Sequence, residues 1–248
     1  MLVPHHNRKH FFNETFFDVI NTERKAYWLG FLYADGANCD KARNVSLSVS
    51  EIDAYILDCL KQDMGSDHKI YVKTSSGFKG KPIHMLLFCS VYLCNSLMKQ
   101  GCIPRKSLTL KFPTTTQVPE HLHNHFIRGY FDGDGSFSFR VVKNKISAKG
   151  TVNIISSEDF CRKLKDILNK FLPIGGYINT HTCESGHKVF YLTLNGGNQV
   201  IQFMDWIYQD ATIFLNRKRE KYREFLISRN QTMSLRLKNT YQPHFVNF

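Results

Sequence analysis

The segment FIRGYFDGDGSF, residues 126–137, combines an apolar helical pattern with an acid-glycine ending directly before a strand-like stretch. Earlier in the chain, WLGFLYADGA at residues 28–37 has nearly the same outline. Both runs end in an aspartate followed by a glycine, Asp35 with Gly36 and Asp134 with Gly135. Two copies of so unusual an ending indicate one shared role.

Small residues recur at helical spacing within both segments. Gly30 and Ala34 share one face of the first helix, because residues four apart lie one above the other. Gly129 and Gly133 share the equivalent face of the second helix. Small side chains let two helix backbones approach closely. We therefore expect the two helices to pack against each other through these four residues.

The glycine after each aspartate predicts how the helices end. Gly36 and Gly135 suit the left-handed conformation that commonly terminates a helix. Asp35 and Asp134 then lie at helix C-termini, where the helix dipole disfavours a carboxylate by roughly 0.3–1 kcal/mol. Helices that run side by side also bring the two carboxylates together. A divalent cation such as Mg²⁺, bound through oxygen ligands at a site open to phosphate, would relieve their repulsion.

The repetition extends along the chain. The strand-like NVSLSVSE at residues 44–51 corresponds to TVNIISSE at residues 151–158, and each leads into a helical pattern. Alternating apolar and polar residues predict strands with one buried side and one solvent-facing side. Each half reads helix, two strands, helix, two strands, helix, and closes with an Arg-Lys pair, Arg105-Lys106 or Arg217-Lys218. We predict an α+β fold of two tandem αββαββα repeats related by a pseudo-twofold axis.

A stretch rich in Pro and Thr, residues 111–119, reads as the linker between the repeats. With 248 residues, the chain is long enough for two units that each bury a core. We place the boundary near residue 117. The expected organisation is an N-terminal arm at residues 1–22, a first repeat at residues 23–117, and a second repeat with a basic C-terminal helix at residues 118–248.

The charge balance favours a polyanionic partner. Lys and Arg number 33 against 21 Asp and Glu, a net charge of +12. The basic residues are spread over strand-like segments rather than gathered on one amphipathic helix, which favours nucleic acid over a membrane surface. No apolar run reaches the roughly 18–20 residues of a membrane helix, the N-terminus lacks a secretory pattern, and the seven cysteines form no C-x-x-C pair. We expect an intracellular protein of bacterial or phage cytoplasm, or of a mitochondrial or chloroplast matrix.

The segments WLGFLYADG and IRGYFDGDG resemble the two motif copies of single-chain LAGLIDADG homing endonucleases. The similarity covers roughly residues 23–228, since the strand order, second helix and closing Arg-Lys segment of each half also follow the family. It implies motif helices packed at the pseudo-twofold axis and two saddle-shaped antiparallel sheets that lie in the DNA major groove. One position departs from the pattern: Tyr33 stands where the second copy has Asp132. That position is not a metal ligand in the family.

The resemblance also implies the chemistry. The last acid of each motif, Asp35 or Asp134, binds Mg²⁺ together with the preceding main-chain carbonyl, of Ala34 or Gly133. Mn²⁺ is expected to substitute, and Ca²⁺ to bind without supporting cleavage. Each centre cuts one strand by metal-assisted in-line hydrolysis, leaving short 3′ overhangs.

Four further residues correspond to positions near the scissile phosphates of such enzymes. Lys106 and Lys218 match basic residues of the closing segments, although a solvated basic face is an equally good interpretation of both. Glu51 and Glu158 match polar positions that order water. They are also explained as acids in the first turns of helices capped by Ser50 and Ser157.

Residues on and around the strands are candidates for reading DNA, because donors and acceptors on a wet sheet face can meet base edges in the major groove. They are Arg43, Ser46, Ser48, Lys73, Arg140, Lys143, Lys145, Asn153 and Arg217.

The leading hypothesis is therefore a monomeric, site-specific, Mg²⁺-dependent endonuclease of intron homing that acts on double-stranded DNA with a long target site. One alternative is an RNA maturase that binds intron RNA and assists splicing of a group I intron. Another is a DNA-binding regulator of the same fold that does not cut. The presence of both Asp35 and Asp134 argues against the regulator.

Overall fold

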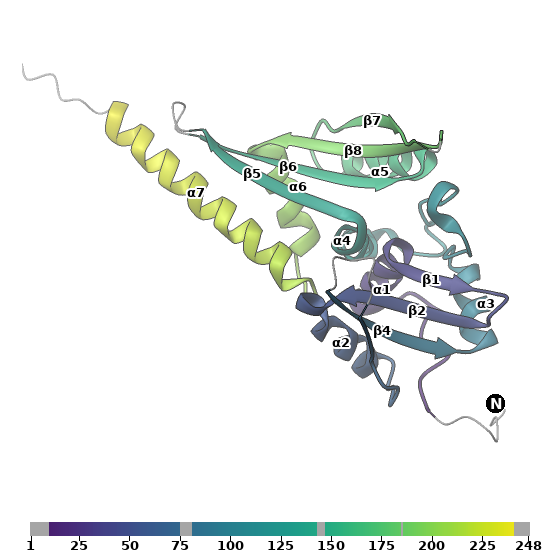
Figure 1. The fold of residues 1–248 in the computed structure, drawn as a ribbon. Coiled ribbons are helices and arrows are strands. Elements are labelled where there is room, and N and C mark those ends of the chain that lie inside the picture. Colours follow the sequence, from purple (N-terminus) through teal and green to yellow (C-terminus); the bar gives the residue numbers. More distant parts are fainter. Residues whose placement is uncertain (1–9, 75–80, 143–146, 185, 241–248) are drawn as a thin grey trace, which may run out of the picture.

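The computed structural model describes residues 10–74, 81–142, 147–184 and 186–240, in which two units repeat one order of elements (Figure 1). The first unit consists of α1 (Glu23–Ala34), β1 (Gly36–Cys39), β2 (Asn44–Ser50), α2 (Tyr55–Asp63), β3 (Tyr71–Thr74), β4 (Pro82–Cys89) and α3 (Val91–Lys99). The second consists of α4 (His123–Asp134), β5 (Gly135–Val142), β6 (Ser147–Ser156), α5 (Glu158–Phe171), β7 (Tyr177–Thr182), β8 (Lys188–Gly196) and α6 (Asn198–Tyr208). The chain also has short 3-10 turns, η1 (Glu51–Asp53), η2 (Lys106–Leu108) and η3 (Glu120–Leu122), and a long final helix, α7 (Asn216–Thr240). The predicted αββαββα order is confirmed in both units.

Each unit contains one four-stranded antiparallel sheet, in the order β1-β2-β4-β3 or β5-β6-β8-β7. The registers are equivalent as well. Ser46 of β2 pairs with Ala37 of β1, and the matching Asn153 of β6 pairs with Ser136 of β5. Figure 1 shows the two sheets on either side of the helix pair α1 and α4. The predicted α+β class is therefore confirmed, including the position of the motif helices at the interface.

The helices α1 and α4 approach each other backbone to backbone. A Cβ atom at Gly30 would overlap the Phe126 carbonyl oxygen and lie 2.9 Å from the Tyr130 nitrogen. A Cβ at Gly129 would overlap the carbonyl oxygen of Tyr27 in the same way. Only glycine fits at these two crossing points, since main-chain atoms cannot rotate out of the way. The close contact aligns the C-terminal ends of both helices.

The expected left-handed ends of these helices are wrong. Gly135 has φ −82° and ψ 150° and already belongs to β5, and Gly36 also lacks a positive φ and begins β1. Glycine is needed there for a different reason: the strand leaves the helix without a linker. A Cβ at Gly36 would lie 2.7 Å from the Leu32 oxygen, and one at Gly135 would lie 2.8 Å from the Phe131 Cα.

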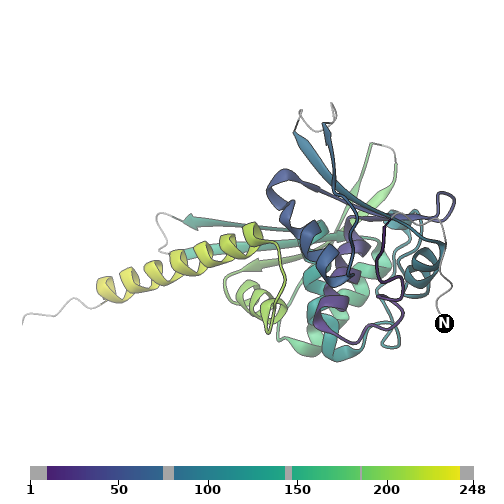
Figure 2. The same cartoon turned by 90° about the horizontal axis from the view of Figure 1, so that it is seen from below.

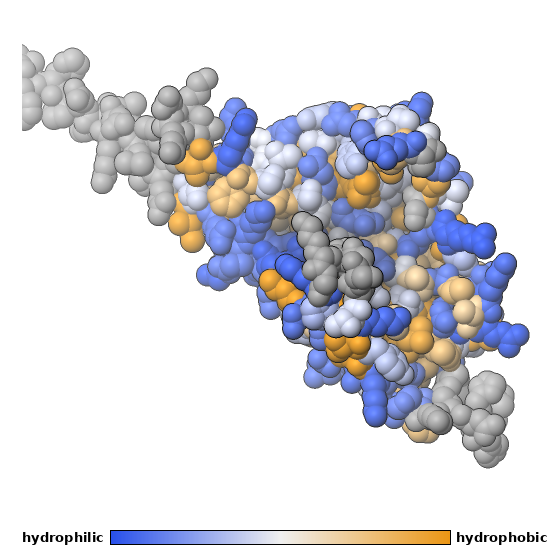
Figure 3. Space-filling model, in the orientation of Figure 1, coloured by the Kyte–Doolittle hydropathy of each residue, from blue (hydrophilic) through white to orange (hydrophobic). Residues whose placement is uncertain are grey.

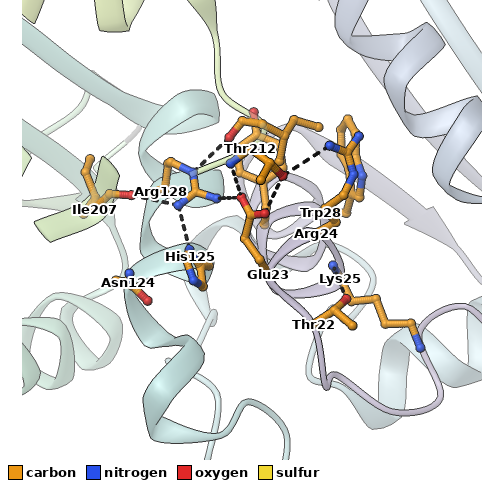
Figure 4. Close-up of polar contacts among 12 residues, drawn as sticks. Thr22, Glu23, Arg24, Lys25, Trp28, Asn124, His125, Arg128, Ile207 and Thr212 are labelled. Atoms are coloured by element: carbon orange, nitrogen blue, oxygen red, sulfur yellow. Dashed lines mark hydrogen bonds and ion pairs between the residues drawn. The ribbon is translucent and has the colours of Figure 1, made fainter. Parts of the chain in front are cut away.

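A buried polar cluster joins the units at the other end of the helix pair (Figure 4). Arg128 of α4 is fully buried, and its guanidinium donates hydrogen bonds to Glu23, His125 and the carbonyls of Ile207 and Ile213. Glu23, the first residue of α1, also accepts a 2.8 Å bond from the Thr212 backbone N–H. The cluster therefore ties α1 to α4 and to the segment that leads into α7.

The chain before α1 is packed on the first unit. Phe16, Phe17 and Ile20 are buried in its core. The Asp18 carboxylate accepts bonds of 2.6 Å from the Tyr92 hydroxyl and 2.7 Å from the Ser96 hydroxyl, both on α3.

The units differ in length. The β5 and β6 strands have 8 and 10 residues, against 4 and 7 in β1 and β2. Helix α7 packs along β5 and β6 and projects with them from the body of the molecule (Figure 2). Hydrophilic residues predominate on the face drawn in Figure 3. In the described part of the chain, none of the helices combines the length and apolar character needed to cross a bilayer.

Candidate active site

The two motif aspartates lie where α1 and α4 end. Asp35 is the C-cap of α1, held by a 2.9 Å bond from its backbone N–H to the Phe31 carbonyl, and Asp134 is the last residue of α4. A Cβ at Gly133 would lie 3.3 Å from Asp35 Oδ2. The Asp35 carboxylate is thus pressed against the last turn of α4, so the seam between the units carries both acids.

Electrostatics couples the two acids. Burial, together with the negative charge of Asp35, raises the pKa of Asp134 to about 6. Burial also raises the pKa of Asp35, against the opposing charges of Lys218, Lys106 and Arg217. Folding without a cation therefore holds two carboxylates in a position that disfavours their charge.

Lys106 and Lys218 donate hydrogen bonds to main-chain carbonyls at the C-terminal ends of the motif helices. Lys106 Nζ donates to the Gly36 carbonyl. Lys218 Nζ donates to the carbonyls of Phe131, Asp132 and Gly135, with distances of 2.8 Å for Asp132 and 2.6 Å for Gly135. A cation there is favoured by the negative end of the helix dipole. Lys218 is 6% exposed, and burial lowers its pKa to about 8, so the interpretation as a solvated basic face fails for this residue.

The lysines act across the seam. Among the charges that lower the pKa of Asp35, Lys218 of the second unit has the largest effect. Among those that lower the pKa of Asp134, Lys106 of the first unit comes first. Each acid is therefore balanced mainly by the lysine of the opposite unit, and the centre is composite.

Sequence similarity to a known family coincides with this geometry. A family model described as a LAGLIDADG-like domain matches residues 122–208, from η3 to the end of α6. The second unit is therefore similar in sequence to a LAGLIDADG-like domain. No curated protein sequence matches the chain.

Solved structures extend the similarity to the fold of both units. The LAGLIDADG meganuclease I-AabMI bound to uncleaved DNA aligns with a TM-score of 0.55 and 11% identity, over 87% of this chain and 92% of the other. The LAGLIDADG homing endonuclease I-GzeII in complex with its DNA target aligns with a TM-score of 0.51 and 11% identity, over 88% and 93%. Both units together therefore have the fold of these LAGLIDADG proteins.

The oxygen donors at the motif ends fit a hard divalent cation. Two coupled carboxylates provide negative charge, and the Lys218 bonds leave the Gly133 carbonyl unused by that lysine. Within the described ranges, no group of three or more His, Cys, Asp or Glu could hold a metal. An ion at Asp35 and Asp134 would complete its shell with water and phosphate, as Mg²⁺ commonly does.

The position that differs between the motifs has a structural role in both. The Tyr33 hydroxyl donates a 2.5 Å bond to the Gln100 carbonyl. Asp132 is 1% exposed and accepts bonds of 2.9 Å from the Tyr27 hydroxyl and 2.8 Å from the Leu215 N–H. Both side chains therefore form hydrogen bonds that stabilise the fold.

The candidate residues Glu51 and Glu158 form no hydrogen bond or ion pair with Asp35 or Asp134 among the described residues. Glu158 forms an ion pair of 2.5 Å with Arg162 one turn along α5, which Ser157 caps by accepting a 3.2 Å bond from Phe160 N. Glu51 is exposed at the start of η1. The predicted cap at Ser50 is wrong: a 3-10 turn follows, and among the described residues the hydroxyl donates to Asp53 Oδ2, at 3.3 Å, instead of capping a backbone N–H.

The strand candidates lie on the wet sides of both sheets. Ser46 and Ser48 alternate with buried apolar residues along β2, and Arg140 and Asn153 occupy similar positions on β5 and β6. Arg43, in the β1–β2 turn with φ 51°, and Lys73 on β3 are exposed. Lys143 and Lys145 lie outside the described residues.

Two cavities show residues that sequence reasoning missed. One, of about 530 Å³, is lined by Arg140 together with Lys149, which is aligned opposite it on β6. The other, of about 450 Å³, is lined by Asp35, by the predicted DNA-binding residue Arg217, and by Asp53, which was not predicted. Alternation along the strand could have suggested Lys149. No local pattern marks Asp53, because its partner comes from the far end of the chain.

Proposed function

We propose that this protein is a site-specific endonuclease that cuts both strands of double-stranded DNA with Mg²⁺. The observation that carries the proposal is the pairing of Asp35 and Asp134 at the seam, each balanced by the lysine of the opposite unit. A protein that only bound DNA would gain nothing from two adjacent carboxylates at a seam that phosphate approaches, since each would repel the backbone.

In this proposal, Asp35 and Asp134 hold the cation with the carbonyls of Ala34 and Gly133. Bound Mg²⁺ would lower the pKa of a coordinated water and neutralise charge that develops on the phosphate. Lys106 and Lys218 keep the ends of the motif helices in place through their carbonyl bonds. Their ammonium groups also add positive charge next to the acids, which favours an approaching phosphate.

The wet sheet faces would hold the target in the major groove. Ser46, Ser48, Arg140 and Asn153 offer side-chain donors and acceptors on these faces. Two four-stranded sheets within one chain suit a long asymmetric site, which a monomer could bind without a partner subunit.

The test starts from a randomised DNA library incubated with the protein and Mg²⁺, from which cleaved sequences are recovered. On the selected site, wild type should cut both strands and leave 3′ overhangs. Asp35→Asn and Asp134→Asn should reduce cleavage by at least about 100-fold while binding persists, because the fold does not depend on the ligands. Asp159→Asn, an exposed acid in the first turn of α5, is the matched control.

The outcome separates the rival functions. Equal cutting by wild type and both motif variants would refute the mechanism. Tight, specific binding without cutting in Mg²⁺ or Mn²⁺ would favour the regulator. Failure to select DNA, combined with faster splicing of an intron transcript, would favour the maturase.

A further inference from the structure

One ion pair crosses from the second unit to the first beside Asp35. Arg217, the second residue of α7, donates from Nε to both oxygens of Asp53 in η1, at 3.0 and 2.9 Å. The Asp53 side chain is 6% exposed, whereas that of Arg217 is 45% exposed. The Asp53 carboxylate is thus buried with both oxygens bonded to Arg217, while the Arg217 guanidinium remains accessible to solvent.

The bonds to Asp53 leave most of the guanidinium available. Among the described residues, neither terminal nitrogen of Arg217 has a hydrogen-bond acceptor. The same side chain lines the cavity of about 450 Å³ that contains Asp35, with Ser48 and Lys81 on its wall. A cavity with two carboxylates, of which Asp53 is paired with Arg217, two cations and an unused pair of guanidinium donors suits a phosphate group next to a metal.

Among the residues that the structure describes, the opposite half has no such pair. The repeat aligns Asp53 with Phe160, a buried ring stacked on Tyr130 at 4.4 Å. The repeat also aligns Arg217 with Arg105, which is exposed, has φ 54° and forms no ion pair within the described part of the chain. Arg217 and Asp53 both act on the charge of Asp35, whereas Asp134 is influenced chiefly by Asp35, Lys106 and Lys218.

We propose that Asp53 is a positioning residue that holds Arg217 against a backbone phosphate of the strand cut at Asp35, so that cleavage of this strand alone depends on the pair. This inference rests on the proposed nuclease function. Asp53 fixes the guanidinium through Nε and leaves both terminal nitrogens for the phosphate oxygens. At the strand cut at Asp134, the aligned Arg105 is not held by such a carboxylate among the described residues, so cleavage there relies on the lysines.

The decisive experiment measures single-turnover cleavage of each strand separately, on the selected duplex with a different label on each strand. Asp53→Asn and Arg217→Gln should slow one strand, the same strand in both variants, by about 10-fold or more, with less than about 3-fold change for the other. Nicked duplex should accumulate. Arg217→Lys should restore only part of the rate, because an ammonium cannot replace the planar donor pair.

Asp63→Asn provides the matched control. Asp63 also receives Arg Nε on both oxygens, from Arg24 at 2.7 Å, but it lies at the end of α2 beside the start of α1. Asp63→Asn should lower the free energy of unfolding, but it should not slow cleavage of one DNA strand more than the other. If Asp53→Asn slows both strands equally, the pair merely holds the units together and the inference is overturned, while the nuclease proposal stands.

A second readout needs no cleavage. Binding of the duplex is measured in Ca²⁺ after single phosphates have been ethylated. With wild type, ethylation of one specific phosphate should block binding. Arg217→Ala should no longer be sensitive to ethylation of that phosphate, whereas Asp63→Asn should remain sensitive. An unchanged ethylation pattern for Arg217→Ala would refute the phosphate contact. If the wild-type protein shows the Arg217–phosphate contact but cuts neither strand in Mg²⁺, the nuclease proposal is refuted instead.

Discussion

Replacing Gly30 by alanine tests the backbone contact on which the composite centre depends. The new Cβ would lie 2.9 Å from both the Phe126 carbonyl carbon and the Tyr130 nitrogen. Ordinary contacts of a carbon atom are about 3.5–4.0 Å. Because both obstacles are main-chain atoms, α1 and α4 would have to separate by roughly 0.5–1 Å.

The expected cost follows from two opposing effects. Overpacking in a well-packed core typically costs about 1–3 kcal/mol, and the rigid obstacle places this site near the upper end. Alanine also gains up to about 1 kcal/mol over glycine in a helix. We expect a net loss of about 2 kcal/mol in the free energy of unfolding, which is roughly 4–8 °C in melting temperature for a chain of this size.

Urea denaturation of wild type and Gly30→Ala measures this difference directly. Gly175→Ala is the control, since a Cβ at this exposed glycine would meet nothing within 4 Å and its φ is not positive. It should be neutral or slightly stabilising, because alanine restricts the unfolded chain. If Gly30→Ala is as stable as wild type, the helices do not approach as closely as described, and the acids need not meet.

Three other changes probe the buried charges. Asp134→Asn should stabilise the metal-free protein by roughly 1–2 kcal/mol at pH 8 in thermal unfolding with a chelator, because it removes a carboxylate whose pKa is raised to about 6 by burial and by Asp35. The contribution of His125 to stability should fall as the pH drops from about 6.5 to about 4, since the unfolded chain then protonates this histidine while burial holds its folded pKa at about 4. His125→Gln should remove that part of the dependence in urea titrations at several pH values. Arg128→Met should cost about 3–5 kcal/mol in urea, because it leaves Glu23 without its buried partner.

The order of elements is readable from the sequence because periodicity changes at the same places in both halves. Apolar-polar alternation in NVSLSVSE becomes β2, with its buried positions at Val45, Leu47 and Val49. Small residues at Gly30 and Gly129 predict the helix interface for a steric reason that the coordinates bear out. These features are local or repeated, so one chain suffices to find them.

Features that depend on distant partners are not readable in this way. The segment NRKREKYRE looks like an exposed basic helix, yet its third residue, Lys218, is buried under the second motif. Arg217 and Asp53 are 164 residues apart, and the repeat aligns Asp53 with an aromatic residue. Sequence repetition reveals the residues that the two halves share, but it does not reveal a pair that is present in only one half.

The difference between the motifs at Tyr33 and Asp132 shows that different chemistry can serve one purpose. Tyr33 binds the carbonyl of Gln100, at the end of α3, from which the chain continues to Lys106. Asp132 binds the N–H of Leu215, from which the chain continues to Lys218. Each side chain therefore anchors the segment that delivers a lysine to the seam. Because a hydroxyl donates to a carbonyl and a carboxylate accepts from an N–H, the residue type follows the backbone group presented to it. The aspartate is thus explained by the position of Lys218, without a role as a ligand.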